Sequence, residues 1–276
     1  MTFEAVWAVY YSGTGTTRRV LRAMAEAAGG TLGVPVRELD YTLPAARERS
    51  YSFHEKDLIF WGSPTYAGRL PNVLLPFLRE HFTGGGATAA AVVLYGNRSY
   101  DDALKELCGV LAANGFLPAA AAALVGEHAF APLLAHGRPD AADIAAAEDF
   151  ARRTAERLRK EESSQPVKVP GREPIGAYYT PLMPNGEPAR FLKAKPVTDP
   201  AACAHCGLCA ALCPMGSIPK EEPTACTGIC IKCQACIRVC PAGAKYFDDA
   251  AFLAHRAMLE ENYIRRRENE FYPPQK

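Results

Sequence analysis

The chain has 276 residues, a formal net charge of +1 and 10 cysteines, and 49% of its residues are hydrophobic. At roughly 150 residues per domain this length suggests two domains, and the balanced composition argues against a disordered or fibrous chain. Acidic and basic residues nearly cancel, and no apolar run reaches the ~18 residues that a membrane-spanning helix needs. We therefore expect no nucleic-acid partner and no membrane span. Because Glu4 comes early and no basic leader precedes it, we also expect a cytoplasmic location.

The first part of the chain alternates apolar, β-rich runs with segments of helical spacing. The predicted strands are 5–11, 34–38, 57–62, 88–95 and 119–125. Helices are predicted after the first strand up to Gly29-Gly30, over 72–81, around 104–111, and from about 140 to 162. This alternation predicts an α/β domain over residues 1–162, built on a doubly wound, five-stranded parallel sheet.

A loop rich in hydroxyl groups and glycine, Ser12–Thr17, follows the first strand and opens a helix. At this place α/β sheets bind phosphate on backbone N–H groups and on the helix dipole. The loop is no Walker motif, because no Gly-Lys-Ser/Thr follows, and Arg18 replaces the third glycine of the dinucleotide fingerprint. The sequence therefore predicts a phosphate cradle made of hydroxyl and amide donors.

Two further loops, 63–68 and 95–100, follow the third and fourth predicted strands and each bring tyrosine to the same edge of the sheet. Aromatic walls with backbone donors suit a flat heteroaromatic ring, although ordinary surface tyrosines remain the alternative. The residues predicted to bind this ligand are Ser12, Gly13, Thr14, Gly15, Thr16, Thr17, Ser63, Pro64, Thr65, Tyr66, Gly68, Tyr95, Gly96, Asn97 and Tyr100.

Nine of the ten cysteines fall between Cys203 and Cys240. Eight of them form two quartets that each read Cys-x2-Cys-x2-Cys-x3-Cys-Pro and repeat after 27 residues. In this pattern three thiolates wrap one iron-sulfur cluster, and the fourth cysteine ligates the other cluster. One predicted ligand set is Cys203, Cys206, Cys209 and Cys240, and the other is Cys213, Cys230, Cys233 and Cys236. Structural zinc is the alternative, but it gives no role to the third cysteine of each quartet or to the prolines.

Two cysteines fall outside these sets. Cys226 has Asp199 as its counterpart in the repeat, so the symmetry gives it no ligand role, and we expect a spare thiol near the second cluster. Cys108 lies on the apolar side of its predicted helix and is expected to pack in the core.

The remaining segments connect or end these units. Residues 163–197 are rich in proline without periodicity and predict an extended, semi-rigid linker before a cysteine domain at 198–250. Residues 251–276 are expected to form a helical tail, with the helix running to about Glu270. The arginines at 265–267 fit a solvated last turn better than the alternative, a docking patch.

These motifs resemble two known families. The loops at 12–17, 63–68 and 95–100 resemble those of flavodoxins, and residues 198–250 resemble a bacterial-type ferredoxin, a small α+β domain with two [4Fe-4S] clusters. The combination resembles the flavodoxin/ferredoxin fusion proteins of anaerobes, often called EFR-type ferrodoxins. The resemblance implies FMN as the flavin, with Thr14, Thr16 and Thr17 on its phosphate and Tyr66 or Tyr100 against the isoalloxazine.

We therefore expect electron transfer between the clusters, FMN and a redox partner protein whose identity the sequence does not give. The alternative is an oxidoreductase that reduces a small molecule at FMN and needs a general acid, for which Glu127 and His128 are the candidates. Their alternative role is ordinary loop polarity. A third possibility is a cluster-bearing binding module without flavin.

Overall fold

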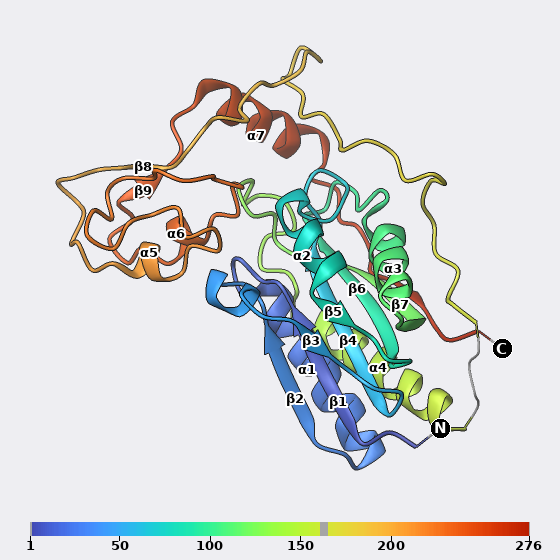
Figure 1. Cartoon of the computed structure of the whole chain (residues 1–276). Coiled ribbons are helices and arrows are strands. Elements are labelled where there is room, and N and C mark those ends of the chain that lie inside the picture. Colours follow the sequence, from blue (N-terminus) through green and yellow to red (C-terminus); the bar gives the residue numbers. More distant parts are fainter. Residues whose placement is uncertain (1, 161–164, 276) are drawn as a thin grey trace.

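A central, mostly parallel sheet organises the chain in the computed structural model, which describes residues 2–160 and 165–275 (Figure 1). The strand order is β10-β7-β6-β4-β1-β2. The parallel strands are β1 (Ala5–Tyr10), β2 (Val36–Asp40), β4 (Asp57–Pro64), β6 (Thr88–Tyr95) and β7 (Leu117–Val125). This is the doubly wound order of flavodoxin-like proteins, in which the chain reverses direction across the sheet between β1 and the strand beside it, here β4. The predicted α/β fold and parallel sheet are confirmed.

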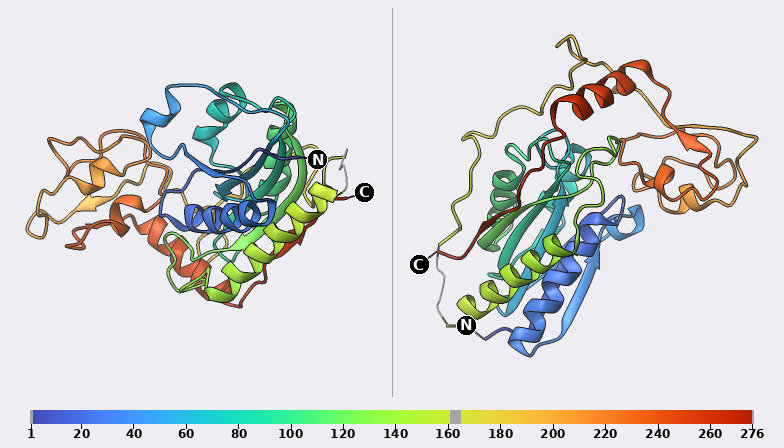
Figure 2. Two further views of the ribbon diagram at one scale, coloured as in Figure 1. Left: turned by 90° about the horizontal axis from the view of Figure 1, so that it is seen from below. Right: turned by 180° about the vertical axis from the view of Figure 1, so that it is seen from behind.

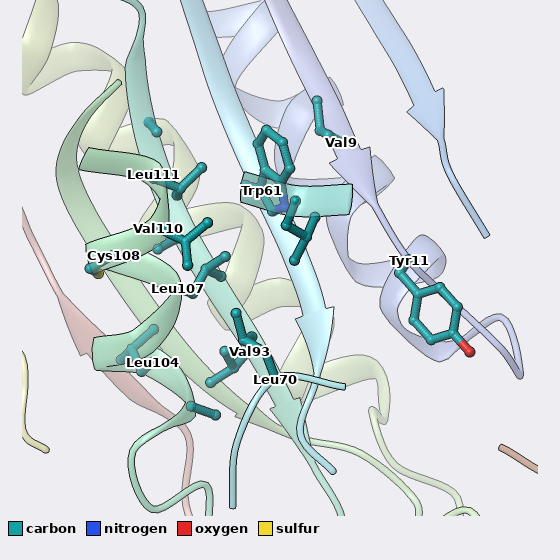
Figure 3. Packing of buried hydrophobic residues seen from close by; sticks show 14 of the residues in the cluster. Val9, Tyr11, Trp61, Leu70, Val93, Leu104, Leu107, Cys108, Val110 and Leu111 are labelled. Atoms are coloured by element: carbon teal, nitrogen blue, oxygen red, sulfur yellow. The ribbon is translucent and has the colours of Figure 1, made fainter. Parts of the chain in front are cut away.

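Helices cover both faces of this sheet. One face carries α1 (Thr16–Leu32) and α4 (Ala141–Lys160), which lie side by side in Figure 2, and the other carries α2 (Leu75–Glu80) and α3 (Ala103–Ala113). Successive residues of each strand alternate between the two cores, as the pleat requires. In Figure 3 the α3 side chains Leu104, Leu107 and Leu111 pack toward Val93 and Trp61 of the sheet. Burial on both faces explains why β1, β4, β6 and β7 are continuous apolar runs, whereas the edge strand β2 is exposed at four of its five residues.

The ends of several elements differ from the sequence prediction, among them those of α1 and β2. Helix α1 passes through Gly29 and Gly30 and ends at Leu32, because Gly33 takes the left-handed conformation (φ 71°) and its N–H binds the Gly29 carbonyl. Strand β2 begins two residues later than expected, at Val36. The predicted end of the last helix at 162 lies outside the described residues, as do the first two residues of the linker. Short elements complete this part of the fold: the 3-10 turns Pro44–Arg47 and Asn72–Leu74, and the strands β3 (Tyr51–Ser52) and β5 (Phe82–Thr83).

The proline-rich segment is extended, and its residues from Val167 to Tyr179 are bound along the surface of the sheet domain. Buried Asp102 accepts hydrogen bonds from the Arg172 N–H and Nε, both at 2.9 Å, and from the Gly176 N–H at 2.9 Å. Further along, Tyr178 Oη donates to the Leu70 carbonyl at 2.8 Å, and the Tyr179 N–H donates to the Ala67 carbonyl at 2.8 Å. The segment therefore acts as a fixed strap.

The two halves of the cysteine repeat share one backbone form. Each contains a single helical turn, α5 (Leu208–Ala211) or α6 (Ala235–Arg238), and β8 (Val197–Thr198) pairs antiparallel with β9 (Lys245–Tyr246). Three pairs of residues 27 positions apart have matching positive φ angles: His205 with Lys232, Gly207 with Gln234, and Gly216 with Gly243. The sequence repeat is therefore also a structural repeat.

The C-terminal tail returns to the sheet. Helix α7 (Ala250–Asn262) ends eight residues before Glu270, and β10 (Glu270–Tyr272) pairs antiparallel with Ala121–Ala123 of β7. The prediction of a helix to about Glu270 and of a five-stranded sheet was wrong here, because the pairing partner lies about 150 residues away in the sequence. Figure 1 shows the tail running from α7 down along β7. In the described residues no helix is long and apolar enough to cross a bilayer.

A buried ion pair fixes the tail. The Arg138 guanidinium, 5% exposed, binds both carboxylate oxygens of Asp143 and donates to the Arg267 carbonyl at 2.6 Å. Asn269 Nδ2 donates to the same carboxylate at 2.9 Å. Burial by itself raises the pKa of Asp143, but the hydrogen bonds from Arg138 and the Asp140 N–H outweigh it, and the pKa lies below its usual value.

We predict that Asp143→Ala destabilises the fold by about 3–5 kcal/mol, because it leaves the Arg138 guanidinium buried without a counter-charge. Asp149→Ala, which removes an exposed ion pair with Arg153, is the control and should cost under ~1 kcal/mol. The midpoint of urea unfolding measures both. Since the folded pKa of Asp143 is lowered, its contribution is fully present above the unfolded value of 3.8 and is lost as the pH falls through the folded pKa. Equal midpoint shifts in the two variants would contradict this account.

Candidate functional site

A pocket of about 240 Å³ lies at the carboxyl ends of the parallel strands. Its walls come from the loops that follow β1, β4, β6 and β7, around the point between β1 and β4 where the chain reverses direction. Doubly wound sheets bind their ligands at this position. The site therefore lies where the sequence places it.

The hydroxyl-rich loop after β1 forms the floor of one end of the pocket. Ser12, Gly13, Thr14, Thr16 and Thr17 line it. The loop is closed on itself, because Ser12 Oγ accepts the Arg18 N–H at 3.1 Å, and Gly15 adopts a positive φ of 85° at the start of α1. The neighbouring arginines lie outside the pocket wall: Arg18 forms an ion pair with Glu38, and Arg19 donates to the Pro139 carbonyl at 3.0 Å.

The two tyrosine loops contribute unequally. Pro64, Thr65, Tyr66, Tyr95 and Gly96 line the pocket. The other predicted positions do not reach its wall: Gly15, Ser63, Gly68, Asn97 and Tyr100.

Asn97 and Tyr100 are instead held by the tail. Asn97 Nδ2 donates to the carbonyls of Tyr263 and Arg265 at 2.6 and 2.9 Å. Tyr100 Oη contacts Glu270 at 2.7 Å and Tyr272 at 2.9 Å, so in the described structure the pocket tyrosines are Tyr66, Tyr95 and Tyr179. No local pattern indicates that Tyr100 binds the tail instead of lining the pocket, because the tail residues that bind it lie 170 or more positions away.

The side of the pocket opposite the sheet consists of residues that the sequence did not suggest. We call this side the outer wall: Tyr179, Pro181, Phe191, Ile231, Lys232, Cys233, His255 and Leu259. It combines the strap, the second cysteine quartet and α7. His255 Nδ1 binds the Leu182 carbonyl at 2.8 Å, and its ring stacks on Phe191 with centroids 5.5 Å apart.

The donors of the pocket fit a ligand with phosphate and ring acceptors. Among the described residues, Thr65 Oγ1 and Tyr179 Oη are buried with no hydrogen-bond partner, and both residues line the pocket. Thr14 and Thr16 share only one long contact, 3.4 Å between their hydroxyl oxygens. Buried hydroxyl groups are rarely left unpaired, so these atoms fit a bound polar ligand such as FMN.

Glu127 and His128, the two general-acid candidates, both line the pocket, and at neutral pH Glu127 is a carboxylate and His128 a neutral imidazole. Burial raises the pKa of Glu127, but the Gly137 N–H and the Arg238 guanidinium, which lies 2.6 Å from a carboxylate oxygen, bring it below the usual value. Burial lowers the pKa of His128 to about 3. Neither group is therefore an acid at pH 7.

The quartet cysteines surround two small cavities. Cys203, Cys206, Cys209 and Cys240 line one, and Cys213, Cys230, Cys233 and Cys236 line the other together with Cys226. The fourth cysteine of each quartet thus lies at the cavity of the other quartet, with its sulfur accepting an N–H at 3.3 Å, from Ser217 for Cys213 and from Ala244 for Cys240.

The thiols are not arranged around a single ion. Within residues 2–160 and 165–275, no three His, Cys, Asp or Glu side chains are placed to hold one metal ion. In a four-iron cluster each thiolate binds a different iron, so its ligands surround a larger volume than those of zinc. Burial raises the pKa of Cys233 and Cys236 to about 12, and such thiols lose their protons when they bind metal. The four thiols at each cavity are those that the sequence groups into one ligand set.

The pocket and the second thiol cavity share a wall. Ile231, Lys232 and Cys233 line both. On the pocket side Cys233 approaches the phosphate loop so closely that a Cβ atom at Gly13 would lie 3.1 Å from the Cys233 Cβ. Outside these cavities, Cys108 of α3 packs in the core, where burial raises its pKa to about 12.

Comparisons with known proteins give structural matches only. No family model matches the chain, and no curated protein matches its sequence. A flavodoxin from the domain Archaea aligns over 57% of this chain and 99% of its own, with 16% identity and a TM-score of 0.41. An azoreductase from Bacillus anthracis str. Sterne covers 56% of this chain and 100% of its own, with 15% identity and a TM-score of 0.37. The strand order, rather than these distant matches, carries the flavodoxin-like assignment.

Proposed function

We propose that the protein is an electron carrier that holds FMN in the pocket and two [4Fe-4S] clusters on the two thiol sets. It exchanges electrons among these centres and with a redox partner protein. FMN takes up one or two electrons and each cluster takes one, so a chain with all three can connect one-electron and two-electron carriers. Thiolate ligands need a reducing compartment, and the proposal therefore includes a cytoplasmic location.

One observation carries the proposal: the wall that the pocket shares with the second thiol cavity. Two redox centres separated by three residues can exchange electrons inside one molecule. The grouping of the thiols adds support, because it follows the exchange of the fourth cysteines that two-cluster ferredoxins use.

Each part of the chain has a place in this proposal. Residues 1–162 form the FMN domain and residues 198–250 the cluster domain, and the segments 163–197 and 251–276 hold the two together. Thr14, Thr16 and Thr17 donate to the FMN phosphate, and Tyr66 lies against the ring system. The rival function, reduction of a small molecule at FMN, lacks a carboxylic acid at Glu127 and an imidazolium at His128.

Composition analysis tests the cofactors directly. Protein purified without oxygen should contain about eight iron, about eight acid-labile sulfide and about one FMN per chain. Iron and sulfide are measured colorimetrically and FMN by fluorescence after heat release. Zinc without sulfide would reject the clusters, and clusters without FMN would leave a binding module in place of the carrier.

We predict that Cys213→Ala damages the cluster held by Cys230, Cys233 and Cys236 and spares the other, because Cys213 lies at their cavity. Electron paramagnetic resonance of the reduced protein separates the two clusters. Cys226→Ala is the matched control, since Cys226 lines the same cavity but its counterpart in the repeat is Asp199 rather than a cysteine, and it should keep both clusters. Selective loss of the cluster on Cys203, Cys206 and Cys209 after Cys213→Ala would contradict the crossed arrangement.

A further inference from the structure

The shared wall contains one charged side chain. Of Ile231, Lys232 and Cys233, which line both the pocket and the second thiol cavity, only Lys232 carries a positive charge. Its ammonium donates to the Cys230 carbonyl at 3.1 Å and to the Leu192 carbonyl of the strap. No carboxylate of the described residues forms an ion pair with it. A half-buried positive charge is thus held between two cavities by neutral carbonyl groups.

The backbone does not explain a lysine at this position. Lys232 has a φ of 57°, and its counterpart in the first repeat, His205, has a φ of 50°. Glycine, asparagine, aspartate and histidine adopt this left-handed region more easily than lysine does. His205 is exposed and lines neither the pocket nor the first thiol cavity. What distinguishes Lys232 from His205 is therefore its position in the shared wall.

A charge in this place acts on both cavities. Reduction adds negative charge to a redox centre, and a nearby positive charge stabilises the reduced form and makes its reduction potential less negative. Inside a protein this effect is stronger than in water, because the effective dielectric constant is lower. One ammonium between two centres therefore influences both of them.

We propose that Lys232 tunes the reduction potentials of FMN and of the second cluster together. This inference rests on the proposed function. The three-residue wall would then couple FMN and the second cluster electrostatically, besides giving electrons a short path between them. The potential of the first cluster, on the other thiol set, would stay largely unaffected. Lys232 therefore acts on both redox centres through the location of its positive charge.

The test is an anaerobic redox titration of the full chain with its cofactors. Absorbance follows FMN, and electron paramagnetic resonance follows the two clusters separately. In Lys232→Gln, which keeps a hydrogen-bond donor but removes the charge, the potentials of FMN and of the second cluster should both become more negative. The first cluster should keep its potential, and Lys232→Arg, which keeps the charge, should stay near the parent at all three centres.

Lys195→Gln is the matched control. Lys195 also belongs to the cluster side of the protein, and its ammonium donates to the Thr227 carbonyl at 2.9 Å, but it lines neither cavity. The FMN reduction potential of Lys195→Gln should equal that of the parent protein.

Several outcomes would overturn the inference. An unchanged FMN potential in Lys232→Gln, or an equal FMN shift in Lys195→Gln, would show that Lys232 has no special influence. Lys232→Met removes both the charge and the hydrogen-bond donor. Loss of the second cluster in both Lys232→Gln and Lys232→Met would mean that Lys232 holds the cysteine loop in place instead of tuning the potentials. Absence of FMN or iron from the parent, measured first, would reject the proposed function rather than this inference.

Discussion

The close approach of two loops, one from each end of the sequence, is the constraint on which the site depends. The loop Ser12–Thr17 meets the second cysteine quartet at Gly13, where a Cβ atom would lie 3.1 Å from the Cys233 Cβ and 3.6 Å from the hydroxyl oxygens of Tyr11 and Tyr66. Such a Cβ contact is tighter than ordinary van der Waals packing, so Gly13 allows the cysteine loop to serve as a wall of the pocket. Without this contact the pocket and the second thiol cavity would be separate sites.

Polar contacts at both sides of the approach hold the loops in place. Arg238, at the end of α6, forms an ion pair with Glu127 and donates to the His128 carbonyl at 3.3 Å. On the other side, the Arg47 guanidinium reaches the Pro214 carbonyl of the first quartet. These contacts join the cysteine repeat to loops at the carboxyl edge of the sheet. They are charge-assisted, which makes them stronger than neutral hydrogen bonds.

Local patterns were sufficient to predict the five parallel strands but not β10, because four of the five are apolar runs bounded by turn residues. The thiol grouping was predictable for a similar reason, since the crossed sets follow from spacing alone. The outer wall was not predictable: Tyr179 and His255 have no periodic or motif signal, and they reach the pocket only because strap and tail are bound along the sheet. Tyr100 shows the same limit, because its hydroxyl group is bound by Glu270 of a strand that only long-range pairing creates.

The strap and tail also change how the two units relate. A proline-rich segment by itself is a semi-rigid spacer that leaves domains free to separate. Here the hydrogen bonds to Asp102 and the pairing of β10 with β7 fix both connections to the sheet domain. The central claim is therefore that electrons pass between clusters and flavin within one chain.

Anaerobic rapid mixing tests that claim most directly. The clusters of the full chain are reduced with dithionite, and the bleaching of FMN is followed at several protein concentrations. Transfer across the shared wall predicts a first-order rate that does not depend on protein concentration. A rate that rises linearly with protein concentration would mean that electrons pass between molecules, and it would contradict the account.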